Sequence, residues 1–193
     1  MDRIVPLANT LIIALWVIWL IVWTSAAFAV KRTQRRERLG PTLVERVPVI
    51  AGFLVLVLSR WLPTALTTRF LPEPPGLALV ALILVVAGMI IAYWARLHLG
   101  RNWSGEVMVK VGHTLITSGP YRWVRHPIYS GMTLALVGTA LATGAPYGFI
   151  GLALILFGFL VRVRQEEALM RETFHGEYDD YSRHTARLIP GVY

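Results

Sequence analysis

Two segments in the second half of the chain hold most of the side chains that could do chemistry. The first, residues 113–129, combines histidine, tyrosine, arginine and proline within a short stretch. Gly119-Pro120 predicts a turn, and Pro127 suits the first turn of a helix. The free backbone N–H groups at such a helix start favour an anion. A plainer interpretation is a membrane-surface loop whose arginines and tyrosines contact lipid headgroups.

The second segment, residues 162–181, pairs arginines with glutamates at helical spacing. Arg164 and Glu167 are three residues apart, and Arg162 and Glu166 are four apart, so each pair shares a helix face. Two interpretations remain open. The arginines snorkel to the membrane surface beside glutamate partners, or the four side chains line a polar pocket in which glutamate holds a cation and arginine holds a carboxylate.

Other kinds of site are disfavoured. The chain has no cysteine, which excludes disulfides, thiolate metal sites and a catalytic thiol. Its five histidines form neither an HxxxH nor an HExxH pair, so we predict no metal site. No strand pattern precedes a GxGxxG motif, which argues against a Rossmann-type cofactor site.

The composition indicates an all-α, polytopic integral membrane protein. Hydrophobic residues make up 55% of the 193 residues and charged residues only 16%, whereas soluble domains carry about 25% charged residues. The net charge of +8 would suggest nucleic acid in a soluble protein. Here the basic residues flank apolar runs, so we expect a membrane surface and no nucleic-acid partner.

The apolar runs predict about five transmembrane helices. A turn at residues 144–146 divides the last run into a helical hairpin, and the polar tail predicts an amphipathic helix against the membrane. We therefore divide the chain into three N-terminal membrane helices, 1–97, and a C-terminal part, 98–193, that carries both polar segments. The runs cover residues 4–30, 47–62, 76–97 and 128–161.

Charge placement predicts the orientation. Most of the 19 lysines and arginines lie between the first and second runs, between the third and fourth runs, and in the tail. By the positive-inside rule these three segments are cytoplasmic, with the N-terminus outside and the C-terminus inside. The two polar segments are then expected to meet on the cytoplasmic face.

Together the two segments resemble the isoprenylcysteine carboxyl methyltransferase family and its phospholipid-methyltransferase relatives. The resemblance spans about the C-terminal half, residues 97–190, and the first two runs carry no recognisable motif. The matching motifs are His113-Thr114-Leu115-Ile116, Gly119-Pro120-Tyr121, Arg125-His126-Pro127-Ile128-Tyr129, Arg162 with Glu166-Glu167, Phe174-x-Gly176-x-Tyr178-x-x-Tyr181 and Arg187-Leu188-Ile189-Pro190.

The resemblance implies a methyltransferase that binds S-adenosylmethionine in a cytosol-facing pocket formed by the central loop and the C-terminal helix. It implies a lipophilic acceptor, such as the carboxylate of a prenylated cysteine, met among membrane lipids. Either Arg162 or Arg164 is expected to orient that acceptor, which makes residues 98–193 the catalytic part. The implied cofactor contacts are His113, Thr114, Leu115, Ile116, Tyr121, His126, Pro127, Ile128, Tyr129 and Glu167.

Roles follow from the chemistry of that cofactor. Glu167 is expected to neutralise its ammonium, and Tyr121 or Tyr129 to face its sulfonium through a cation–π contact. The helix start at Pro127 suits its carboxylate.

Other functions stay open. A phospholipid or other lipid amine is an alternative acceptor, and a non-enzymatic membrane scaffold is a further option. NADPH-dependent membrane sterol reductases also have a similar C-terminal half that ends in Pro-Gly-x-Tyr, as residues 190–193 do. Those enzymes are usually much longer, and Gly119-Pro120-Tyr121 with Glu166-Glu167 favours a methyltransferase.

Overall fold

The chain folds as a bundle of long helices. The computed structural model describes residues 3–28, 43–100 and 115–192, and within these ranges it contains no strand, only an isolated bridge between Val124 and Ala186. The all-α prediction is confirmed. The helices are α1 Ile4–Phe28, α2 Leu43–Val57, α3 Thr64–Thr67, α4 Pro75–Leu99, α5 Pro127–Thr143 and α6 Pro146–His184, with short 3-10 turns η1 Ser59–Trp61 and η3 Gly119–Arg122.

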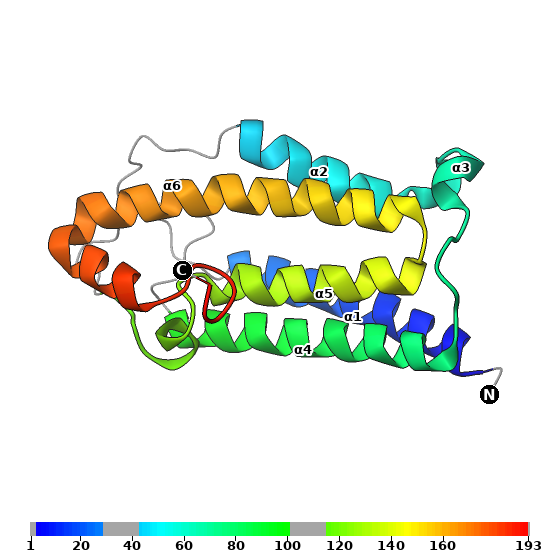
Figure 1. The fold of residues 1–193 in the computed structure, drawn as a ribbon, viewed down its shortest axis with the longest axis horizontal. Coiled ribbons are helices and arrows are strands. Elements are labelled where there is room, and N and C mark those ends of the chain that lie inside the picture. Colours follow the sequence, from blue (N-terminus) through cyan, green and yellow to red (C-terminus); the bar gives the residue numbers. More distant parts are fainter. Residues whose placement is uncertain (1–2, 29–42, 101–114, 193) are drawn as a thin grey trace.

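The helices form two groups (Figure 1). Helix α2 packs along α6, while α4 packs against both α5 and α1. Apolar side chains from several helices join in one core, among them Trp19 of α1, Val85 of α4, Leu136 of α5 and Ile155 of α6.

The protein is an integral membrane protein. In the described ranges three helices are long and apolar enough to cross a membrane, and they are α1, α4 and α6. Helix α2, with 15 residues, lies in the second predicted run, and α5, with 17 residues, lies in the first half of the fourth. Within the described ranges, five helices of 15 residues or more therefore lie where five membrane helices were predicted, although α2 begins four residues earlier than its run and ends before residue 62.

The chain differs from the prediction after residue 161. Instead of a separate amphipathic helix, α6 continues without a break as far as His175, whose φ of 42° marks a kink. Good helix formers such as Gln165, Glu166 and Ala168 fill this stretch, so nothing stops the helix at the membrane edge. The predicted turn at residues 144–146 is confirmed, with Gly144 left-handed at φ 58°.

Glycines bring the paired helices into backbone contact. A methyl group on Gly131 of α5 would overlap the backbone oxygen of Gly88 of α4, and one on Gly88 would overlap that of Gly131. The same holds between α6 and α2, where a Cβ on Gly158 would lie 2.7 Å from the backbone oxygen of Glu45. Small residues at helix contacts are typical of membrane bundles, because close approach replaces the hydrophobic effect as the source of attraction.

Replacing Gly131 by alanine is expected to destabilise the bundle. The overlap with Gly88 costs about 1–3 kcal/mol, which outweighs the gain of about 0.5–1 kcal/mol in helix propensity. Thermal unfolding in detergent measures the effect. Gly76→Ala is the matched control, because nothing lies within 4 Å of a Cβ there. Equal midpoints for the two variants would contradict this packing.

Candidate active site

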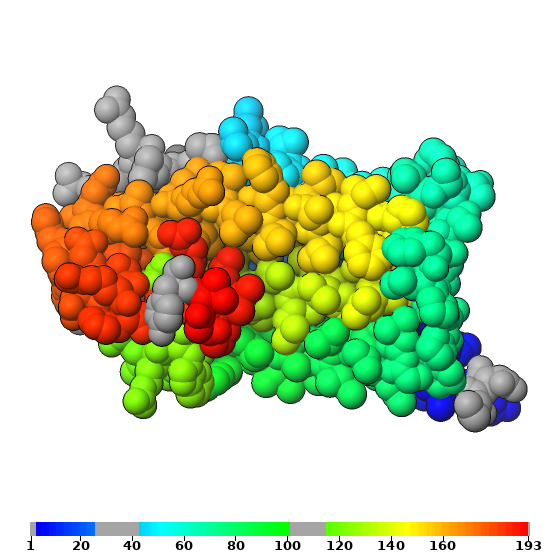
Figure 2. Space-filling view, viewed as in Figure 1, coloured from blue at the N-terminus to red at the C-terminus, as the bar shows by residue number. Residues whose placement is uncertain are grey.

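The two polar segments lie side by side at one end of the bundle, as the sequence predicts. Backbone N–H groups of Arg125 and His126 donate to the carbonyls of Ala186 and Arg187, at 2.8 and 3.2 Å. Ser130 Oγ donates to the carbonyl of Leu188 at 2.5 Å. The C-terminal segment, residues 185–192, is thereby fixed beside the start of α5, and Figure 2 shows it on the surface next to α5 and α6.

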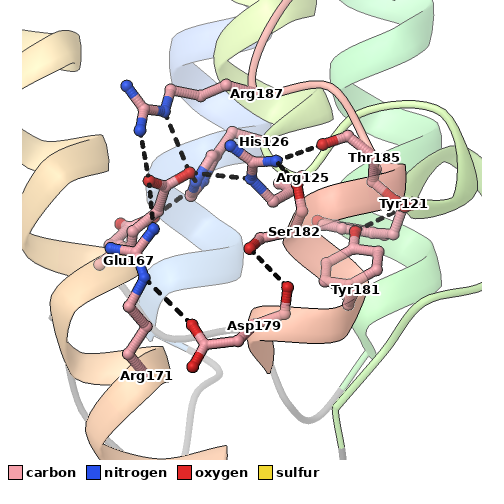
Figure 3. A network of polar contacts seen from close by, with 11 residues as sticks. Tyr121, Arg125, His126, Glu167, Arg171, Asp179, Tyr181, Ser182, Thr185 and Arg187 are labelled. Carbon is pink, nitrogen blue, oxygen red and sulfur yellow. Dashed lines mark hydrogen bonds and ion pairs between the residues drawn. The ribbon is translucent and has the colours of Figure 1, made fainter. Parts of the chain in front are cut away.

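Glu167 is the centre of the resulting network (Figure 3). Its side chain is 1% exposed and accepts from Arg125 Nε at 2.9 Å and from Arg187 Nε and Nη2 at 3.1 and 2.8 Å. Arg171 Nη2 lies 3.6 Å away. Because both carboxylate oxygens already accept from guanidinium groups, Glu167 ties α6 to the start of α5 and to the C-terminal segment.

Arg125 links the same elements through backbone carbonyls. Its Nη1 donates to the carbonyl of Ser182 at 2.7 Å and also to that of Thr185. The hydroxyl of Tyr181 donates to the carbonyl of Tyr121 at 2.6 Å. These bonds hold the chain after the His175 kink against η3.

Glu166 forms a second cluster on the neighbouring face of α6. Its Oε1 accepts from the Tyr129 hydroxyl at 2.7 Å and from Arg162 Nε at 2.9 Å. Arg162 Nη1 in turn lies 3.3 Å from Oε1 of Glu45 on α2. This cluster therefore joins three helices, α2, α5 and α6.

His126 stands between the two glutamates. Its Nδ1 lies 3.5 Å from Glu166 Oε2, and its Nε2 lies 3.5 Å from Glu167 Oε1. Within the described residues, Nε2 is buried without a well-oriented hydrogen bond. Burial alone would lower the pKa of His126, but the two carboxylates outweigh burial and raise the pKa above its usual value.

The raised pKa of His126 predicts a pH-dependent contribution to stability. Protonated His126 stabilises the folded chain fully below its unfolded-state pKa of about 6.5, and this stabilisation is lost as the pH rises through the raised folded-state pKa. The difference in thermal midpoint between the wild type and His126→Gln is therefore expected to shrink from pH 6 to pH 9. A difference that stays constant over this range would count against the charged form.

The structure separates the two candidate arginines. Arg162 is half-buried in the Glu166 cluster, whereas Arg164 is exposed on α6. Arg164 and Glu167 are three residues apart on α6, but Arg164 is exposed whereas Glu167 is buried. The arginines that contact Glu167 among the described residues are Arg125, Arg171 and Arg187.

The other predicted cofactor contacts lie around these clusters. Leu115, Ile116 and Ile128 are half-buried, and Pro127 is buried. Tyr121 is buried in η3, and burial, together with the charge of Glu166, raises its pKa. His113 and Thr114 lie outside the described residues.

Several residues of these two clusters were not predicted as site residues, among them Arg125, Arg171, Arg187 and Glu45. Arg125 and Arg187 stand inside the matching motifs, and this position in the motifs is the signal that could have found them. Glu45 gave no such signal, since it is a single acidic residue at the edge of an apolar run.

Comparison with known proteins agrees with the motifs. The family model described as "Isoprenylcysteine carboxyl methyltransferase (ICMT) family" matches residues 80–172. The uncharacterized protein YpbQ of Bacillus subtilis is 30% identical over 159 residues, which is 79% of this chain and 93% of that protein. The human protein-S-isoprenylcysteine O-methyltransferase is 31% identical over 146 residues, 72% of this chain and 51% of the relative. The chain belongs to the isoprenylcysteine carboxyl methyltransferase family.

Other family members show the same partial coverage. A probable protein-S-isoprenylcysteine O-methyltransferase of Oryza sativa subsp. indica is 32% identical over 116 residues, 58% of this chain and 61% of that protein. The chain thus spans about half to three-fifths of the length of the curated methyltransferases it matches. The solved structure of the eukaryotic intramembrane Ras methyltransferase ICMT superposes with a TM-score of 0.54 at 22% identity, over 76% of this chain and 52% of that one, which supports a shared fold.

Proposed function

We propose that this protein is an integral membrane methyltransferase that moves a methyl group from S-adenosylmethionine to the carboxylate of an isoprenylated cysteine. The observation that carries the proposal is the half-buried Arg162 beside the buried network that the family motifs form. A guanidinium at such a depth suits an anionic partner, and a carboxylate is the acceptor in the named relatives.

The described residues fit the proposed cofactor. S-adenosylmethionine carries an ammonium, a sulfonium and a carboxylate. Glu166 offers a carboxylate, Tyr129 an aromatic face, and His126 a buried ring nitrogen without a well-oriented hydrogen bond. Arg171 and Arg187 are partly exposed at the edge of the network and suit a carboxylate. Glu167 remains a candidate partner for the ammonium, although Arg125 and Arg187 already donate hydrogen bonds to its carboxylate.

In the proposed reaction, the residues of this chain mainly position the cofactor and the acceptor. When bound, the cofactor supplies an activated methyl group. A carboxylate acceptor is already ionised near pH 7 and needs no general base. Arg162 would orient it, and Glu166, hydrogen-bonded to both Tyr129 and Arg162, would hold that arginine in place. Positioning in a site shielded from water supplies much of the rate enhancement of such transfers.

The purified chain in detergent, with methyl-labelled S-adenosylmethionine and N-acetyl-S-farnesylcysteine, tests this proposal. We expect label on the acceptor that base releases as methanol, because a methyl ester is base-labile. The matched control is the same acceptor with its carboxylate converted to an amide, which should take no label. Base-stable label on phosphatidylethanolamine would instead indicate the lipid-amine reaction, and NADPH oxidation with a sterol would indicate the reductase.

We also propose that the site faces the cytoplasm. The polar clusters lie where α4 ends and α5 begins, which is also the end that α2 starts from (Figure 1). Several arginines stand at that end, among them Arg46, Arg96, Arg122, Arg125 and Arg162. A reporter fused after Tyr193 is expected to be active only in the cytoplasm. Activity on the opposite side would reverse the orientation.

A further inference from the structure

Glu45 is a buried carboxylate that the methyltransferase motifs do not include. It lies in the first turn of α2, outside the matched residues 80–172, and its side chain is 3% exposed. It reaches α6, 117 residues further along the chain, to contact Arg162. A buried charge is costly unless it is well paired, so its place beside this arginine calls for an explanation.

The pairing of Glu45 is incomplete. Its Oε1 lies 3.3 Å from Arg162 Nη1, whereas Glu166 Oε1 accepts from Nε of the same arginine at 2.9 Å. The other oxygen, Oε2, is buried with no hydrogen-bond partner among the described residues. A buried acceptor left unsatisfied costs about 1–3 kcal/mol. Of the two carboxylates that contact Arg162 within the described residues, Glu45 is therefore the weaker partner and the easier one to displace.

The turn that carries Glu45 is also weakly held. Pro48 lies inside α2 and has no N–H to donate to the carbonyl of Val44. At the same time, the backbone of Glu45 rests on Gly158, one turn before Arg162 on α6. The close packing on Gly158 thus places the side chain of Glu45 beside Arg162, although the turn of α2 that carries Glu45 lacks a backbone hydrogen bond.

We propose that Glu45 is a placeholder, which occupies Arg162 until the carboxylate of the acceptor replaces it. This inference rests on the proposed function and names a specificity-determining residue for it. When no acceptor is present, Glu45 pairs with Nη1 of Arg162, while Glu166 stays on Nε. An acceptor with an anionic head displaces Glu45, whereas a neutral head leaves the internal pair intact.

The placeholder reduces the apparent affinity for the acceptor. If Glu45 occupies Arg162 for about 70–90% of the time, the apparent dissociation constant rises about three- to tenfold. Glu45→Gln keeps the shape and removes the competing charge. We therefore expect this variant to bind N-acetyl-S-farnesylcysteine about three- to tenfold more tightly in the absence of cofactor, and to leave the KM for S-adenosylmethionine unchanged.

Further variants make the test specific. In an Arg162→Gln background, Glu45→Gln should change acceptor binding no further, because the contested arginine is gone. Glu73→Gln is the matched control, since Glu73 lies at the same 3.3 Å from an arginine, Arg69, at the other end of the bundle; acceptor binding should not change. Should Glu45→Gln fail to fold, Glu45→Asp carries the test, because its shorter side chain withdraws from Arg162.

Unchanged or weaker acceptor binding in a folded Glu45 variant would overturn the placeholder and leave Glu45 as an anchor between α2 and α6. An equal gain with and without Arg162 would overturn it too. If the wild-type chain transfers no methyl group to a prenylcysteine, the proposed function fails and the placeholder falls with it. That outcome is distinct, because it is seen without any change at Glu45.

Discussion

Glu167→Ala is expected to lower the free energy of unfolding by about 3–5 kcal/mol, because removing one partner of a buried ion pair leaves the other charge uncompensated. Here two arginines lose their acceptor at once, and Arg125 is itself buried. The C-terminal segment should then separate from the start of α5. Chemical or thermal unfolding in detergent measures the loss, and faster proteolysis near residue 185 reports the separation.

Glu172→Ala is the matched control for Glu167→Ala. It removes a glutamate from the same helix, five residues further on, at an exposed position. Surface substitutions of this kind usually change stability by less than about 0.5 kcal/mol. If the two variants unfolded alike, Glu167 would not hold the network together.

Arg162→Ala is expected to lower kcat/KM for the acceptor by about 10- to 150-fold, with the affinity for S-adenosylmethionine nearly unchanged. The range corresponds to the loss of charge-assisted hydrogen bonds worth about 1.5–3 kcal/mol. Arg162→Lys should rescue poorly, because Nε and Nη1 contact two different carboxylates and one ammonium cannot reproduce that fork.

Arg164→Ala provides the control for Arg162→Ala, since Arg164 is exposed two residues away on the same helix. Methyl transfer and cofactor binding should be measured separately for both variants. Parallel loss of cofactor binding and turnover in Arg162→Ala would show that this arginine serves the cofactor instead of the acceptor.

The membrane helices could be predicted from the sequence because a helix that crosses a membrane needs a long apolar run. Such a run is continuous in the sequence and can be recognised without knowing the fold. The turn at Gly144 was also predictable, since glycine before alanine and proline favours it. The end of the last membrane helix could not be predicted, because good helix formers follow the apolar run and α6 continues through them beyond residue 161.

The site residues also differ in whether the signal for them is local in the sequence. Residues such as His126 and Glu167 could be named as candidates from the sequence because each stands in a short segment rich in polar side chains. Glu45 was missed because its contact with Arg162 depends on Gly158, which lets α2 approach α6. The sequence left Arg162 and Arg164 as equal candidates, since their difference lies in where α6 turns relative to α2 and α5.

The way the helices pair has a consequence for the order in which the chain matures. Helices α4 and α5 follow one another in the sequence, so they can associate soon after insertion, through Gly88 and Gly131. Helix α2 can pair with α6 only after α6 has been synthesised and inserted, because Glu45 and Arg162 are 117 residues apart in the sequence. Association across such a separation is slow. Newly inserted chains should therefore pass through a stage in which α4 and α5 are docked while α2 and α6, with Glu45 and Arg162, have not yet paired.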